Sequence, residues 1–177
     1  MWSGWGVVNL KSRVISKNPD TVFIEFAIND AQPLYRTSVE DARLNLTNMI
    51  NRVLLYNPDT EIILMTMNLP VWEYRKQTPV TGEYYQMYRD VAKERNLPLI
   101  DHALNWQNLV QNDIKLFMKY VPDGVHPGKE GCLNVITPAI LKSLGIQTGL
   151  NATQVLHHPA IQSPARPDQD ATGPEIP

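Results

Sequence analysis

The sequence predicts an α/β fold built on a parallel sheet, and three observations support this prediction. Apolar runs of strand length alternate with longer segments whose apolar residues recur every three or four positions. The runs are rich in β-branched and aromatic residues, which is typical of parallel strands covered on both faces. Asn-Pro-Asp stands just before two of these runs, at 18–20 and 57–59. Such strand–helix alternation folds as a sheet with helices on its faces.

The first half of the chain predicts two helices and one strand. Apolar residues within 5–17 indicate a helix that Asn-Pro-Asp ends, and the nearly continuous apolar run Thr21–Ile28 indicates a buried strand. Thr37 and Glu40 have the spacing of a capping box, so the second helix is expected to begin there and to end at Asn57-Pro58. Its apolar residues lie three and four positions apart: Val39, Ala42, Leu46, Met49, Ile50, Val53 and Leu54.

The second half continues the alternation. Glu61–Met67 is predicted as another buried strand, residues 81–95 as a helix, and Leu97–Asp101 as a short third strand. Two further helices are expected near 103–112 and 130–144.

The composition divides the chain into one domain and a tail. Residues 1–146 carry the periodic segments and are predicted to form a single α/β domain. Residues 147–177 are rich in proline and polar side chains without periodicity, which indicates a disordered tail.

Charge and cysteine content exclude several classes of function. The net charge is −2 and no cluster of Lys or Arg occurs, so no nucleic-acid partner is expected. No apolar run approaches the ~20 residues that span a bilayer, and Met1–Gly6 has neither the basic nor the apolar part of a signal peptide. The single cysteine, Cys132, excludes an internal disulfide and is expected to be a buried helix residue. No metal or cofactor is expected.

Asp123-Gly-Val-His126-Pro127 is the stretch with the clearest chemical meaning. It places a carboxylate and an imidazole three positions apart in a loop that glycine and proline stiffen. A histidine acts as a general base through one ring nitrogen when a carboxylate holds the other. The stretch therefore predicts a catalytic pair, with His126 as the base and Asp123 as its orienting partner.

Asn29-Asp30 follows the first predicted strand and suggests a second part of a site. Ligands of an open parallel sheet bind beyond the carboxyl ends of its strands. A side-chain amide at that edge can donate a hydrogen bond to a developing oxyanion. Taken alone, Asn-Asp after a strand also fits an ordinary turn.

Together, Phe26-Ala-Ile-Asn29-Asp30 and Asp123-Gly-Val-His126-Pro127 resemble two signature blocks of the SGNH, or GDSL-type, hydrolase family. Ala27 occupies the position where the family has glycine. The resemblance implies a three-layer, flavodoxin-like α/β sandwich and an esterase or acylhydrolase activity. It also implies that Asn29 is an oxyanion-hole donor, that His126 is the base, and that Asp123 supports His126.

Two other blocks of that family have no match in the chain. The family's nucleophile lies in a Gly-Asp-Ser turn, and that tripeptide does not occur here. The family's second block, which carries an oxyanion-hole glycine, would fall just before Met1. Ser3 is a poor candidate for the nucleophile, because it lacks the Gly-x-Ser-x-Gly frame and a preceding strand. The expectation is a hydrolase whose first strand or strands are missing.

The apolar character of Thr21–Ile28 supports the same expectation. Without upstream strands this run would lie at or near a sheet edge, yet it carries only one charge, Glu25. Exposed edge strands are normally short, charged or covered. The chain is therefore expected to self-associate through that edge or to need further strands.

Other candidate residues are set aside. Asp101 and His102 are adjacent, so on a strand their side chains point to opposite faces and cannot easily form a pair. A metal cluster of Asp30, His102, Asp123 and His126 has no recognised ligand spacing. The aromatic residues after the second strand could line a carbohydrate pocket or pack a helix: Trp72, Tyr74, Tyr84, Tyr85 and Tyr88.

Three functions remain open from the sequence. The first is a serine esterase that removes acetyl or short acyl groups from a small-molecule or carbohydrate ester. The second is a non-catalytic remnant that keeps a ligand-binding cleft, which the absent serine favours. The third is a flavodoxin-like nucleotide-binding module, with Gly4-x-Gly6 as its phosphate loop.

Overall fold

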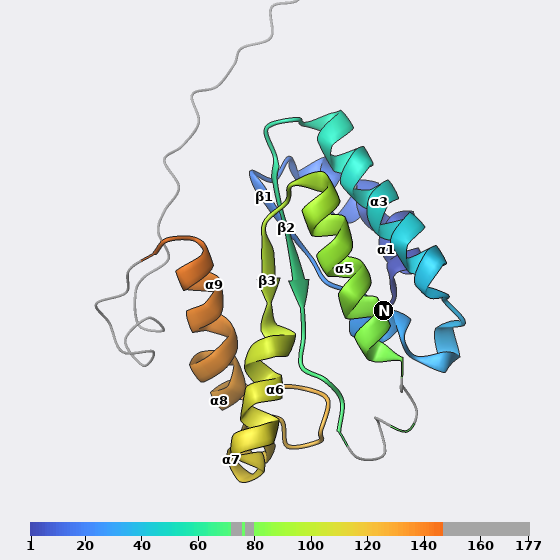
Figure 1. Cartoon of the computed structure of the whole chain (residues 1–177). Coiled ribbons are helices and arrows are strands. Elements are labelled where there is room, and N and C mark those ends of the chain that lie inside the picture. Colours follow the sequence, from blue (N-terminus) through green and yellow to red (C-terminus); the bar gives the residue numbers. More distant parts are fainter. Residues whose placement is uncertain (72–75, 77–79, 147–177) are drawn as a thin grey trace, which may run out of the picture. The chain divides into compact units, whose positions relative to one another are not determined.

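A three-stranded parallel sheet forms the centre of the computed structural model, which describes residues 1–71, 76 and 80–146. The strands lie in chain order and are β1 (Thr21–Ile24), β2 (Glu61–Thr66) and β3 (Leu99–Asp101). The predicted α/β fold with a parallel sheet is confirmed (Figure 1). The tail predicted over 147–177 lies outside the described residues.

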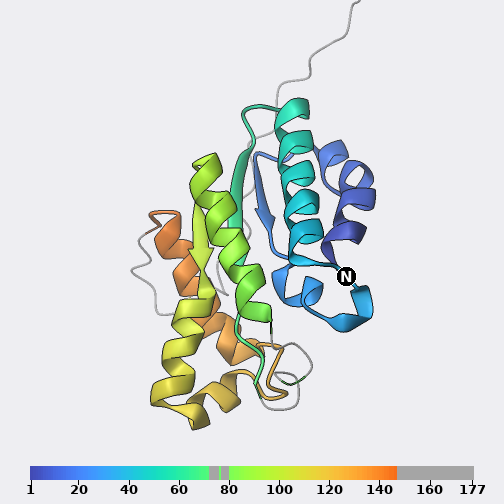
Figure 2. The same ribbon diagram turned by 45° about the vertical axis from the view of Figure 1, so that its right-hand side comes forward.

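Helices lie on both sides of the sheet. The longer ones are α1 (Ser3–Arg13), α3 (Val39–Tyr56), α5 (Thr81–Arg95), α6 (His102–Asn112), α7 (Ile114–Tyr120) and α9 (Thr137–Ser143). Figures 1 and 2 show α1, α3 and α5 side by side, with α9 next to β3 on the side of the sheet away from α5. Within the described ranges, no helix has both the length and the apolar character needed to cross a bilayer.

The main core lies between the sheet and the helices α3 and α5. The register pairs Val22 with Ile62 and Ile24 with Leu64, so these side chains point to the same face of the sheet. The same cluster contains Leu46, Met49 and Ile50 of α3 and Tyr85, Tyr88 and Val91 of α5. The apolar stripe predicted for α3 is thus its buried face.

β1 is an edge strand within the described residues. It pairs with β2 on one side, and no other described strand pairs with its second side. Phe23 is 41% exposed, and none of Thr21–Ile24 is charged. This strand therefore lacks the protection by charge that edge strands usually have.

The first strand is shorter than predicted. It ends at Ile24, and Ala27–Asp30 form the one-turn helix α2 in place of a continued strand. The N–H of Phe26 donates to the Tyr88 hydroxyl (3.0 Å), and the N–H of Asp30 donates to the Phe26 carbonyl (2.8 Å). The apolar pattern could not show this bend, because Ala27 and Ile28 are buried in the one-turn helix, as residues of a core strand would be.

The capping box of α3 lies one residue later than predicted. The Asp41 N–H donates to Ser38 Oγ (3.0 Å), and the Ser38 N–H donates back to the Asp41 carboxylate (3.4 Å). The Thr37 hydroxyl instead donates to the Tyr35 carbonyl. Two overlapping pairs had the required spacing, and the turn before the helix selects Ser38.

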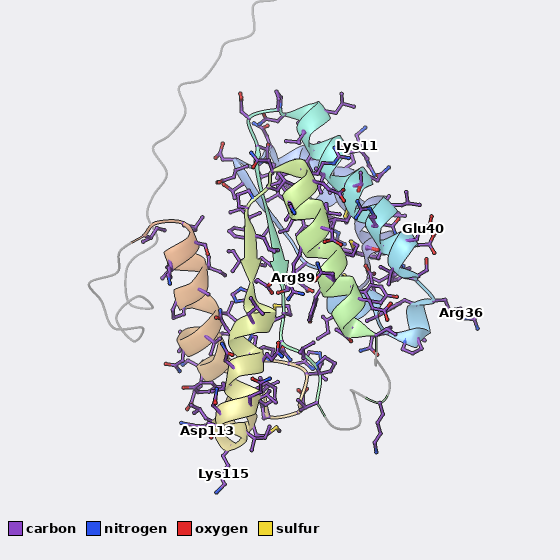
Figure 3. The ribbon with its side chains drawn as sticks, in the orientation of Figure 1. Lys11, Arg36, Glu40, Arg89, Asp113 and Lys115 are labelled. Atoms are coloured by element: carbon purple, nitrogen blue, oxygen red, sulfur yellow. The ribbon has the colours of Figure 1, made fainter. Side chains whose placement is uncertain are left out.

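The last part of the domain is more broken than the sequence predicts. The unpredicted helix α7 begins where the Asp113 side chain accepts the Leu116 N–H (2.9 Å), and Figure 3 labels Asp113 there. The helix predicted over 130–144 consists of α8 (Lys129–Gly131), a π-helical segment (Cys132–Ile136) and α9. Pro138 has no N–H and removes one helical hydrogen bond from this stretch. Cys132 is exposed, contrary to the prediction.

Gly131 gives a stability test of the packing between α7 and α8. A Cβ there would lie 2.6 Å from the Tyr120 carbonyl oxygen and 3.2 Å from the Trp106 ring. Gly131→Ala should therefore lower the free energy of unfolding by about 1–3 kcal/mol, measured by urea denaturation. Gly82→Ala is the matched control, because a Cβ at that exposed helical position meets nothing within 4 Å. The control should be neutral or stabilising by up to ~1 kcal/mol. Equal stability of the two variants would contradict the packing described here.

Candidate active site

The loop from Asp123 to His126 folds around the Asp123 carboxylate. One carboxylate oxygen accepts the N–H groups of Val125 (2.8 Å) and His126 (2.7 Å). The other lies 2.7 Å from Nδ1 of the His126 ring. Gly124 has a φ of +81°, a left-handed conformation that glycine adopts without strain. The spacing seen in the sequence thus brings the two predicted residues into contact.

The hydrogen bonds keep Asp123 ionised. Partial burial acts to raise the pKa of its carboxyl group, but the His126 N–H, the His126 ring and the Val125 N–H outweigh it and lower the pKa to about 2. Asp123 is therefore an anion throughout the neutral range. It holds Nδ1 of His126 and leaves Nε2 for another partner, while the His126 side chain is 77% exposed. This is the arrangement that a histidine base requires.

The loop is attached to the carboxyl end of β2. The Val71 N–H donates to the Gly124 carbonyl (3.1 Å), and Asn68 Nδ2 donates to the Val125 carbonyl (2.8 Å). Val125 of the loop and Val121 just before it are buried. The chain segment after β2 therefore fixes the Asp–His pair at the edge of the sheet where ligands of such folds bind.

Asn29 lies at the same edge of the sheet, at the carboxyl end of β1. It belongs to α2 and is half-buried, and its side-chain amide has no hydrogen bond to another described residue. No hydrogen bond joins it to Asp123 or His126 among the described contacts. Within the described part of the chain no hydrogen bond competes for this amide, and its role as an oxyanion-hole donor stays a prediction.

Asp30 anchors the α2 turn to the start of α1. Its buried carboxylate accepts the Ser3 N–H (2.7 Å). Burial raises the pKa of this carboxyl group, and the hydrogen bonds from Ser3 partly offset the rise. Ser3 Oγ also accepts a hydrogen bond from Asn45 Nδ2 (3.0 Å), and Ser3 is only 1% exposed. Ser3 therefore joins three elements and is not accessible to a substrate.

Gly4 and Gly6 lie inside α1 and form no phosphate loop. A Cβ at Gly6 would lie 2.8 Å from the Phe26 ring and 2.9 Å from Met49 Sδ. Gly6 therefore allows close packing of α1 against its neighbours. The structural basis for a nucleotide-binding module is absent at this position.

Asp101 is held by Arg89 and Thr66, and no hydrogen bond joins it to His102 among the described contacts. Arg89, labelled in Figure 3, donates to Asp101 from Nε (2.7 Å) and Nη2 (3.1 Å), and Thr66 Oγ1 donates as well (2.7 Å). Burial opposes ionisation of Asp101, but these hydrogen bonds outweigh it and lower its pKa. His102 is fully buried, and burial lowers its pKa.

The aromatic residues of α5 form part of the core. Tyr84, Tyr85 and Tyr88 are each at most 5% exposed, so the interpretation of these three as pocket-lining residues is wrong. Trp72 and Tyr74 lie outside the described residues. In the part of the chain that the structure describes, no three His, Cys, Asp or Glu side chains gather as metal ligands would.

Glu25 is a residue near the site that sequence reasoning passed over. It lies at the end of β1, where its carboxylate accepts the Ile28 N–H at 3.4 Å. Burial raises the pKa of Glu25 to about 7, against the hydrogen bond from Ile28 and with the help of the nearby Asp30 charge. The available signal was that Glu25 is the one charged residue in an otherwise apolar run.

Glu25 should make stability depend on pH. The folded chain keeps its proton up to about pH 7, whereas the unfolded chain releases it near 4.5. Stability should therefore fall as pH rises from 4.5 to 7, because unfolding in this range releases the Glu25 proton and a higher pH favours that release. Glu25→Gln should remove this part of the slope and raise Tm at pH 8, measured by thermal unfolding across pH. The exposed Glu61→Gln is the control, and a stability difference that is constant with pH would contradict the assignment.

Comparisons with known proteins found solved structures that share this fold. The chain is similar in structure to a GDSL-like lipase from Parabacteroides merdae, with a TM-score of 0.73, 18% identity, and coverage of 83% of this chain and 70% of that one. An acetylxylan esterase from Geobacillus stearothermophilus has a TM-score of 0.70 and 18% identity, and the match covers 83% of this chain and 69% of that one. A lipase/acylhydrolase from Enterococcus faecalis has a TM-score of 0.65 and 23% identity, and the match covers 82% of this chain and 70% of that one. No curated protein matches the chain in sequence.

These structural likenesses show the fold, and the sequence shows the family. The sequence model of the GDSL-like lipase/acylhydrolase family matches residues 2–132, a range that includes Asn29, Asp123 and His126. The chain belongs to the GDSL-like lipase/acylhydrolase family.

Proposed function

We propose that the chain provides the base and the oxyanion-binding amide of a serine ester hydrolase. The observation that carries the proposal is the 2.7 Å contact between Asp123 and an exposed His126 at the ligand-binding edge of the sheet. Membership of an acylhydrolase family supports ester hydrolysis as the reaction. Similarity to an acetylxylan esterase supports acetyl or short acyl groups on carbohydrate as the substrate class.

Each residue has a defined role in the proposed reaction. Nε2 of His126 takes the proton of a serine hydroxyl as that oxygen attacks the ester carbonyl, and Asp123 stabilises the imidazolium that forms. The Asn29 amide donates to the oxyanion of the tetrahedral intermediate. His126 then protonates the leaving alcohol, and water releases the acid from the acyl-enzyme by the same steps.

The nucleophile is proposed to come from outside these 177 residues. The sequence has no Gly-Asp-Ser. Ser3 is buried, and it forms hydrogen bonds with Asp30 of α2 and Asn45 of α3. One edge of β1 has no partner among the described strands, and β1 leads directly into α2 and Asn29, so we propose that an added strand pairs there. Pairing of that edge with a second copy of the chain is the competing outcome, and size-exclusion chromatography with light scattering distinguishes it.

A non-catalytic binding protein is the second candidate function. The missing nucleophile and the engaged Ser3 favour it, since the Asp–His pair and Asn29 could still hold a ligand without turnover. Esterase assays on the 177-residue chain and on a form extended upstream in frame distinguish the two candidate functions.

His126→Ala should abolish hydrolysis in a form of the chain extended upstream in frame to include a serine. Loss of the base should lower kcat/KM for p-nitrophenyl acetate by about a thousandfold or more. The control is the exposed Lys115→Ala on α7, which should keep full activity. Activity of the extended form that survives His126→Ala would overturn the assignment of the base. If neither the 177-residue chain nor the extended form hydrolyses any acyl ester tested, the binding function is favoured.

Asn29→Ala should act on the transition state. Loss of one oxyanion-hole donor lowers kcat by about a hundredfold to a thousandfold, with a much smaller effect on KM. Asn29→Ala in the extended form should keep the Tm of its parent, because no described residue forms a hydrogen bond with the Asn29 amide. A change confined to KM would assign Asn29 to substrate binding instead.

A further inference from the structure

Asn68 is a buried polar residue beneath the Asp123–His126 loop. It follows β2, and its side chain is fully buried. A buried amide without hydrogen bonds is costly, so the contacts that it does make carry structural meaning. Asn68 Nδ2 donates to the Val125 carbonyl at 2.8 Å, while Asn68 Oδ1 has no partner among the described residues. Among the described residues, the side chain therefore serves only as a donor to the loop.

The Val125 carbonyl belongs to the peptide unit that also carries the His126 N–H. A peptide unit is planar, so a hydrogen bond that fixes the carbonyl also fixes the direction of the N–H on its other side. That N–H donates to the Asp123 carboxylate at 2.7 Å. The Asn68 amide on one side and the Asp123 carboxylate on the other thus hold this peptide plane.

Asn68 itself is held from α5. The hydroxyl of the buried Tyr85 donates to the Asn68 backbone carbonyl at 2.8 Å. A second tether runs parallel to the first, because the Val71 N–H donates to the Gly124 carbonyl at 3.1 Å. The exposed loop is therefore connected through Asn68 to a helix of the main core.

We propose that Asn68 is a positioning residue for the catalytic base, which clamps the Val125–His126 peptide so that Asp123 and His126 keep their contact. The geometric part of this proposal stands on the hydrogen bonds alone, and its catalytic consequence rests on the proposed function. An aspartate would place an acceptor against the Val125 carbonyl, and an alanine would leave that buried carbonyl without a partner.

The charge state of Asp123 reports on the clamp. Asp123 has a pKa of about 2 because three hydrogen bonds stabilise its anion. In Asn68→Ala the His126 N–H should lose its fixed direction, so the pKa of Asp123 should rise toward its ordinary value of 3.8. Carboxyl-carbon NMR titration of the 177-residue chain measures this. Wild-type Asp123 should stay ionised down to about pH 3, and the variant should not.

Two further variants separate positioning from general stability. Asn45→Ala is the matched control, because it also removes an asparagine amide that donates a hydrogen bond, here to Ser3. Neither Asn45 nor Ser3 belongs to the Asp123–His126 loop, so the Asp123 titration should stay unchanged. Tyr85→Phe removes only the hydroxyl that holds Asn68, so it should shift the Asp123 pKa in the same direction by a smaller amount. This variant also serves if Asn68→Ala does not fold.

The upstream-extended form gives the catalytic readout. Asn68→Ala should lower kcat for p-nitrophenyl acetate about tenfold or more and leave KM nearly unchanged, because it disturbs the base and not the binding surface. An Asp123 titration that is unaltered in folded Asn68→Ala and Tyr85→Phe overturns the proposal. A shifted titration with no esterase activity in any form supports the clamp and overturns the proposed function.

Discussion

The Asp123 carboxylate is the group on which the candidate site depends. Its two oxygens accept three hydrogen bonds from within four residues, so one anion both folds the loop and holds the histidine. The same contacts that set the loop geometry also lower the pKa of Asp123. Folding of the loop therefore also stabilises the Asp123 anion that holds the His126 ring. Loss of the charge would release the ring and the turn together.

The loop alone cannot place the pair relative to the sheet, and the scaffold supplies that second constraint. Asn68 and Val71, just after β2, hold consecutive carbonyls of the loop, at Val125 and Gly124. At β1, the buried Asp30 ties α2 to α1 and so fixes Asn29 next in sequence. The two halves of the site thus depend on strands that are hydrogen-bonded neighbours, β1 and β2. The parallel register of β1 and β2 therefore fixes the position of α2 relative to the segment that follows β2.

The sequence predicts what depends on local pattern and misses what depends on tertiary contacts. The α3 stripe, the three strands and the Asp123–His126 contact follow from periodicity or from a spacing of three residues. The α2 turn escapes such reasoning, because Tyr88, distant in sequence, accepts the Phe26 N–H that a strand would have used. Asn68 is missed for the same reason, since its partners are 57 and 17 residues away. Glu25 stands out in the sequence as the one charged residue of an apolar run, but its raised pKa follows from burial, which only the structure shows.

The exposure of His126 sets a physical condition on any nucleophile that completes the site. Preorganised hydrogen-bond donors stabilise an oxyanion strongly only where water is excluded. The side chains of His126 and Asp123 are 77% and 46% exposed, so the pair is open to solvent in the described part of the chain. A segment that merely delivered a serine hydroxyl would leave the imidazolium and the oxyanion in a high-dielectric setting. The proposed hydrolase therefore requires that the segment supplying the serine also cover the His126 ring. The uncharged edge of β1, which offers backbone pairing next to α2, is a place from which one segment could do both.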